Sequence, residues 1–87
     1  MNTMFLLMAE FETSTIPLDD IAERYLGIKK ETASKKADAG DLPIPSFRLR
    51  ESQKSPRLVH VHDLAEYIDQ CREEAKKEFA HFNKELL

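Results

Sequence analysis

Apolar residues recur at helical spacing near the start of the chain and predict two short helices. The first helix is expected over residues 4–12, capped by Thr3, because apolar positions repeat every third or fourth residue. Its inner face comprises Met4, Leu7, Met8 and Phe11. The second stripe has the same period and comprises Leu18, Ile21, Ala22, Tyr25 and Leu26. Pro17 suits the start of this second helix, and the acidic residues Asp19 and Asp20 follow it, where the helix dipole favours anions.

A glycine turn separates the second helix from a third helix that is rich in lysine. Gly27 directly follows the last apolar residue of the second helix, where a left-handed residue often ends a helix. The third helix is expected over residues 30–39, with the small Ala33 and Ala37 facing inward. The proline-rich segment 42–45 cannot continue it. Two helices joined by a tight turn predict a helix-turn-helix, whose second helix enters a DNA groove.

Alternation of apolar and polar residues predicts a β-hairpin after the third helix. The first strand is expected to turn its basic residues outward, in the order Phe47, Arg48, Leu49 and Arg50. On the return strand valines alternate with histidines, in the order Val59, His60, Val61 and His62. The polar segment 51–56 forms the tip between the strands. A helix-turn-helix followed by a basic hairpin is a winged helix-turn-helix, and its wing is expected on phosphate backbone or in a minor groove.

One long helix is predicted from Asp63 to about Lys84. Its apolar stripe recurs every three or four residues, at Leu64, Ile68, Cys71, Ala75, Phe79, Phe82 and Leu86. This stripe is longer than the surface that so small a domain can cover, so its distal half is expected to meet a partner helix. We therefore divide the chain into a DNA-binding domain at residues 1–70 and a helical extension at 71–87. The extension is expected to form a homodimer.

Together these elements predict a fold that is mainly α with a small β-hairpin, a winged helix-turn-helix with a long C-terminal helix. The 87 residues, 41% hydrophobic and 33% charged, fit one soluble domain with a modest core. The single cysteine, Cys71, excludes an internal disulfide and favours a cytoplasmic protein. Its position on the apolar stripe predicts a small core residue. No apolar run approaches the ~20 residues that a membrane-spanning helix needs, so no membrane partner is expected.

Positive charge is concentrated in the middle of an acidic chain. The whole chain carries a formal net charge of −3. Residues 27–62 contain eight basic and four acidic residues, a net of +4, whereas the remaining residues contain five basic and twelve acidic residues, a net of −7. Such an asymmetry indicates a polyanionic partner, and the predicted fold makes that partner double-stranded DNA.

Candidate DNA contacts are the basic and small polar residues of the third helix and the hairpin. Lys35 lies opposite the alanine face on a helical wheel, with Thr32 nearby and Ser34 and Lys36 on the flanks. Lys30 lies nearer the alanine side. The hairpin cations have no evident core role, which leaves phosphates as their expected contacts. The full set is Lys29, Lys30, Thr32, Ser34, Lys35, Lys36, Arg48, Arg50, Ser52, Gln53, Lys54 and Arg57.

The chain resembles the pyocin activator (PrtN-like) family of small bacterial and phage transcription regulators. The likeness begins at residues 5–9 and continues through 16–18. Its most specific part is Ser52-Gln53-Lys54, followed by Arg57, Val59-His60 and the segment 63–69. A looser likeness, through Gly27 and the segment 40–43, is to excisionase-like and MerR-like winged domains. The resemblance implies a DNA-binding activator of bacteriocin or prophage genes.

Alternative interpretations stay open. Within DNA binding, an excisionase-like protein would bend DNA for recombination. In another class, a protein-interaction module would bind RNA polymerase or a regulator protein through its acidic helices, and its basic patch would be incidental. The lysines of the third helix could be a solvated face, the hairpin cations could protect an exposed edge strand, and Ser52 and Gln53 could only form a turn.

No motif in the sequence indicates an enzyme, a cofactor or a metal site. There is no glycine-rich phosphate loop and no pair of cysteine ligands. His60 and His62 would share a strand face, but no third ligand lies near them in sequence, and His81 stands apart. We therefore expect these histidines to have no metal-binding role.

Overall fold

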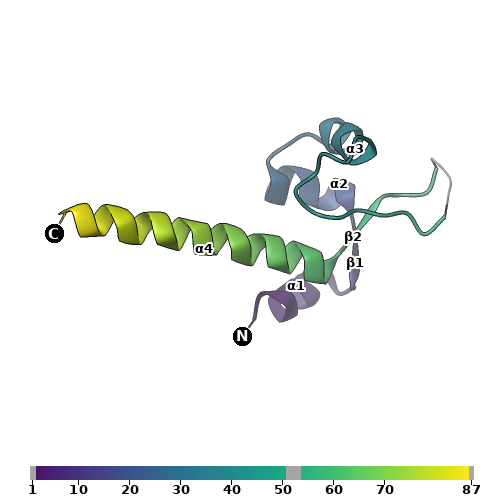
Figure 1. Ribbon diagram of the computed structural model, residues 1–87. Coiled ribbons are helices and arrows are strands. Elements are labelled where there is room, and N and C mark those ends of the chain that lie inside the picture. Colours follow the sequence, from purple (N-terminus) through teal and green to yellow (C-terminus); the bar gives the residue numbers. More distant parts are fainter. Residues whose placement is uncertain (1, 51–53, 87) are drawn as a thin grey trace.

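The computed structural model describes residues 2–50 and 54–86 and shows a small head with one long helix leaving it (Figure 1). The molecule measures 56 × 29 × 16 Å along its principal axes. The elements follow the order α1, β1, α2, η1, α3, β2 and α4. The predicted class, mainly helical with a small antiparallel sheet and a long C-terminal helix, is confirmed. The strand positions differ from those expected.

Helix α1 (Thr3–Phe11) packs beside the start of α4. Asn2 caps it, because its side-chain oxygen accepts a hydrogen bond from the Phe5 backbone N–H at 2.9 Å. The prediction that Thr3 is the cap was therefore wrong; the Thr3 hydroxyl donates instead to Asp69 on α4, at 2.6 Å. Leu7 is buried as predicted, but Met8 is 41% exposed because it lies on the outer side of the helix.

The helix-turn-helix is formed by α2 (Leu18–Ile21), its wider-wound continuation η1 (Ala22–Leu26) and α3 (Lys30–Asp38). The first two elements together span the predicted second helix. Gly27 ends them with φ at +68°, the left-handed conformation expected of it, and its N–H bonds to the Ala22 carbonyl. Ala33 is fully buried, so α3 packs closely against α2.

The sheet pairs β1 (Thr15–Pro17) with β2 (Leu58–His60) in antiparallel register, Ile16 opposite Val59. On the other side of β2, Phe47 forms a single bridge with Leu58 through two backbone hydrogen bonds of 2.9 and 2.7 Å. The two predicted hairpin segments therefore meet as expected, but only at Phe47. Leu49, expected to face inward because the basic residues beside it face outward, is 75% exposed.

The main partner of β2 is β1, which was not among the elements predicted from the sequence. Three residues are too few to show an alternating pattern, so the sequence did not indicate β1. Its central residue, Ile16, is nevertheless fully buried, in one core with Leu18, Ile21, Val59, Val61 and Leu64. Pro17 is tolerated at the end of such a short edge strand because its position there needs no ladder N–H.

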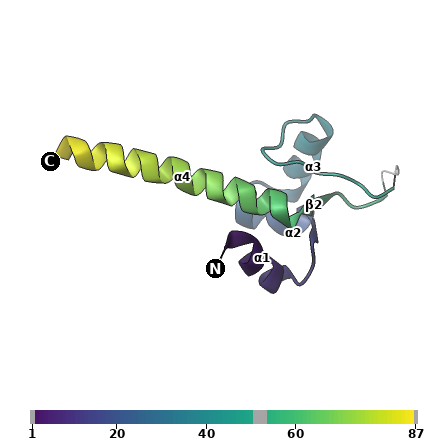
Figure 2. The ribbon, with the colours of Figure 1, turned by 60° about the horizontal axis from the view of Figure 1, so that its bottom comes forward.

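Helix α4 (Val61–Leu86) begins two residues earlier than predicted. His60 explains this start, because its Nδ1 accepts a hydrogen bond from the His62 backbone N–H at 3.0 Å. Val61 and His62 are thus helical, and the expectation that His60 and His62 share a strand face was wrong. Helix α4 runs out of the head (Figure 2), and its side chains from Asp69 to Phe82 are exposed. Cys71 is therefore exposed, contrary to its predicted core position.

Candidate nucleic-acid interface

The outer face of α3 carries most of the polar candidates. Thr32, Ser34 and Lys35 are exposed, opposite the buried Ala33. Lys29 precedes the helix in extended conformation and is exposed, as is Lys30, which was expected nearer the alanine side. Lys36 is half-buried and lies 3.8 Å from Asp41, an ion pair that reduces its charge toward a ligand.

The described parts of the predicted wing, residues 48–50 and 54–57, are joined to the end of α3 by two arginines and one carboxylate; we call these parts the wing. Arg57 Nη2 lies 2.7 Å from Asp38 Oδ1, and Arg48 Nη1 lies 3.9 Å from the same oxygen. Arg57 Nη1 also donates to Ser46 Oγ at 3.1 Å. We call Asp38, Arg48 and Arg57 the clamp. It joins the last helical turn of α3 to the two sides of the wing, at Arg48 and at Arg57.

Arg57 is the central residue of the clamp. Its side chain is only 18% exposed, and its buried Nε has no hydrogen-bond partner among the described residues. Its backbone carbonyl accepts a bond from the Leu18 N–H at the start of α2, at 2.9 Å. The expectation that Arg57 has no core role was therefore wrong. The sequence did not predict the clamp because Asp38 lies nineteen residues from Arg57.

Arg48 has a second structural contact in the wing. Its Nε donates to the Ser55 carbonyl at 3.1 Å, which ties the two sides of the wing together near its base. Charge-assisted bonds of this kind are about twice as strong as neutral ones. These contacts connect the wing base to α3, whereas Arg50 and Lys54, farther along the wing, are exposed.

A cleft of about 210 Å³ lies between α3, the wing base and the start of α2. The structure brings four of the predicted contact residues to it: Ser34, Arg48, Lys54 and Arg57. Asp19 lines its α2 side. Lys29, Lys30, Thr32, Lys35, Lys36 and Arg50 do not line it. Ser52 and Gln53 lie outside the described residues.

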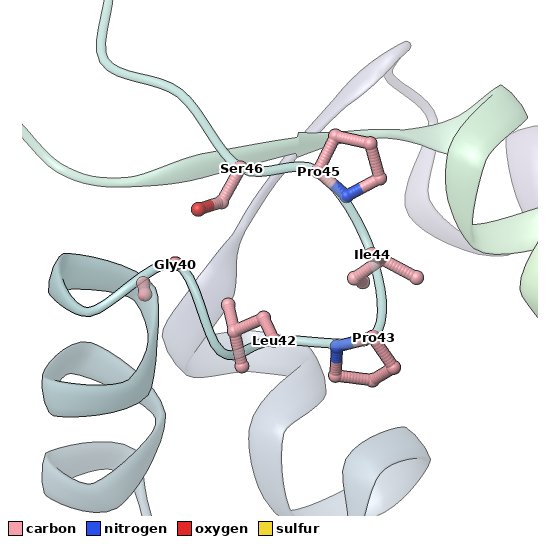
Figure 3. Close-up of a pocket in the computed structure, with 7 residues that line it drawn as sticks. Gly40, Leu42, Pro43, Ile44, Pro45 and Ser46 are labelled. Atoms are coloured by element: carbon pink, nitrogen blue, oxygen red, sulfur yellow. The ribbon is translucent and has the colours of Figure 1, made fainter.

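A second hollow, of about 480 Å³, lies inside the curled connector between α3 and Phe47 (Figure 3). Leu42, Pro43, Ile44 and Pro45 form its wall, and none of its seven lining residues is ionisable. It therefore offers no acid, base or charged ligand. Across the described ranges, no three His, Cys, Asp or Glu side chains gather into a metal-binding group. Nor is any helix there long and apolar enough to cross a membrane.

Two tyrosines have shifted acidity, and both lie away from the clamp. Burial, followed by a 2.9 Å hydrogen bond that its hydroxyl donates to Glu10 of α1, raises the pKa of Tyr25 on η1. Burial, followed by a hydrogen bond with Cys71, raises the pKa of Tyr67 on α4. Both phenols stay protonated near neutral pH and serve packing.

Comparison with known proteins gives one family. The family model described as pyocin activator protein PrtN matches residues 3–75, which is most of the chain. No curated protein matches significantly, and no solved structure does.

Proposed function

Because the chain belongs to the pyocin activator protein PrtN family, we propose that it is a transcriptional activator that binds duplex DNA through α3 and the wing. The observation that carries the proposal is the clamp. It fixes the wing beside α3, so that two basic elements of an acidic chain form one unit. A nucleic acid could then contact both elements at once.

In this proposal α3 lies in the major groove. Thr32 and Lys35, which are exposed opposite Ala33, would meet base edges. The exposed Arg50 and Lys54 of the wing would contact phosphates or the adjacent minor groove. Asp38 would otherwise repel DNA at the end of α3, but Arg57 and Arg48 compensate its charge.

The remaining parts of the proposal concern regulation and assembly. We propose that residues 1–70 form the DNA-binding domain and that residues 71–87 make a homodimer, which would present two copies of α3. Bacteriocin or prophage genes are the proposed targets, and RNA polymerase or another regulator is a further candidate partner. The protein acts in this proposal as a regulator and not as an enzyme, in the cytoplasm and without a cofactor.

The test is a gel-shift titration of duplex DNA over a salt series. Affinity should fall steeply, with a log–log slope of about −0.9 for each phosphate neutralised. The expectation rests on the net charge of +4 in residues 27–62. Equal affinity at low and high salt would contradict the proposal and favour the protein-interaction module. Strong bending over tandem sites would favour the excisionase-like role instead.

A further inference from the structure

An apolar stripe with an eleven-residue period runs along α4, from Ile68 at the edge of the head into the exposed half of the helix. Ile68 is followed by Phe79 and Cys71 by Phe82, each eleven residues later, with Ala75 between them. Phe79 and Phe82 are 71% and 63% exposed. Eleven residues make three turns at 3.67 residues per turn, close to the 3.6 of a straight helix. The stripe therefore keeps to one side of α4, and a second straight helix could lie along it.

The two flanks of this stripe carry opposite charges. Successive residues turn by about 100° around the helix axis. This rotation places Glu74 and Glu78 along one flank, and Arg72 and Lys76 along the other. All four are exposed. Lys76 also lies 3.6 Å from Glu73 on its own helix, but exposed pairs of this kind contribute little.

We propose that two copies of the chain pair through this stripe with their α4 helices parallel. The proposal rests on the homodimer of the proposed function and adds its orientation. A two-fold axis parallel to the helices places each acidic flank against the basic flank of the other copy. A two-fold axis perpendicular to them would place acid against acid and base against base. Flanking charges of this type set helix orientation in coiled coils.

The parallel orientation has a consequence for DNA binding. Both heads then lie at the same end of the helix pair, because α4 starts inside each head and runs away from it (Figure 1). Two copies of α3 could thus approach one DNA segment from one side. Antiparallel helices overlapping only along their exposed halves would hold the heads at opposite ends.

Cys71 is a native reporter of orientation. It lies on the stripe, is exposed and is the only cysteine. In a parallel pair the two Cys71 residues are level and face each other, within the ~7 Å between Cα atoms that a disulfide allows. In an antiparallel pair centred on Phe79 they would be about 24 Å apart along the axis. Oxidation of the full chain with copper phenanthroline should therefore give a disulfide-linked dimer.

The matched control moves the thiol to the opposite side of α4. Cys71→Ser combined with Glu73→Cys keeps one exposed cysteine, two residues farther along, and should remain monomeric on a non-reducing gel. Sedimentation of the unoxidised protein separates the two proposals. A dimer whose Cys71 residues cross-link no faster than the control overturns the parallel orientation alone. A monomer at high micromolar concentration overturns the dimer itself.

Charge reversal provides an independent test. Glu74→Lys with Glu78→Lys makes both flanks basic, which should weaken a parallel dimer about tenfold at low salt. An antiparallel dimer would already hold like flanks together and should change little. Adding Arg72→Glu and Lys76→Glu exchanges the two flanks and should restore the affinity of a parallel pair. Failure of that restoration would contradict the proposal.

Discussion

Asp38 is the residue on which the arrangement of α3 and the wing depends. A carboxylate at the end of a DNA-binding helix would by itself oppose a polyanion. Here its Oδ1 lies 2.7 Å from Arg57 and 3.9 Å from Arg48, so the same charge fixes the wing. Removing an acid from this position therefore has two opposing effects, a gain of positive charge and a loss of order.

The effect of the gained positive charge can be measured separately by substituting a neighbouring acid, Asp41. We expect Asp38→Asn to weaken DNA binding and to destabilise the fold by about 1–3 kcal/mol, because Arg57 loses a charged partner while mostly buried. Asp41→Asn makes the same charge change at an exposed residue 3.8 Å from Lys36, and should leave binding equal or slightly tighter. Thermal melting and gel shifts measure both; equal effects of the two variants would show that the clamp has no role.

At the scale of elements, the helices and β2 could be predicted from the sequence, whereas β1 could not. Helices α1, α3 and α4 each repeat their apolar spacing over nine residues or more, which is enough for a period to be visible. Strand β1 has three residues, and only the burial of Ile16 against Val59 defines it. Cys71 was misplaced because periodicity shows which side of a helix is apolar and not where its covering domain ends.

The residues of the candidate site also fall into two groups, those whose positions could be predicted from the sequence and those whose roles could not. Lys35 and Thr32 could be placed on the open side of α3 because helical geometry fixes their direction. The roles of Arg48 and Arg57 could not be predicted, since they depend on Asp38, which is distant in sequence but 2.7 Å from Arg57 in space. Arg57→Ala is for that reason unsuitable as a probe of phosphate contact, although the sequence analysis expected Arg57 to contact a phosphate.

The exposed residues Lys35 of α3 and Lys54 of the wing test the separate roles of the two elements. Lys35→Ala should cost about 1–3 kcal/mol on the preferred site and much less on random DNA, because in the proposed complex α3 meets base edges. Lys54→Ala should weaken binding to all sequences alike and flatten the salt slope by about one unit.

Affinities for specific and scrambled duplexes across a salt series measure both effects, and melting curves confirm that the variants fold. Should Lys35→Ala reduce the two affinities equally while Lys54→Ala changes sequence preference, the wing and not α3 would be the element that reads bases.

At the scale of the whole molecule, the head and the distal half of α4 differ in how their apolar side chains are covered. The head buries its own core, including Ile16, Ile21 and Leu64, whereas Phe79 and Phe82 have no cover within the described part of the chain. Leaving two such side chains in water forgoes about 1.5–3 kcal/mol for each. The proposed dimer would recover much of this free energy and would double the number of DNA contacts.

Substitutions in the apolar stripe should therefore prevent dimer formation and leave the head folded. Phe79→Asp with Phe82→Asp is expected to give a folded monomer in sedimentation, because neither side chain supports the head. Its binding to DNA with two half-sites, about one helical turn apart, should weaken far more than its binding to a single half-site. Glu73→Asp with Lys77→Arg, on the opposite side of α4, is the matched control. A variant that remains dimeric would place the contact elsewhere.

Because α4 is continuous, the orientation of the head is fixed relative to the apolar stripe at the other end of the helix. The helix runs from the buried Val61 to the exposed Phe79 without a proline or glycine, so the apolar stripe and the head cannot rotate independently about the helix axis. In the proposed dimer one inserted residue between them would swing each head by about 100° about the helix axis. Eleven inserted residues would return it almost to its starting angle. Relatives of this chain should accordingly differ in the length of α4 by multiples of eleven residues, which make three whole turns. Single-residue insertions in α4 should be selected against.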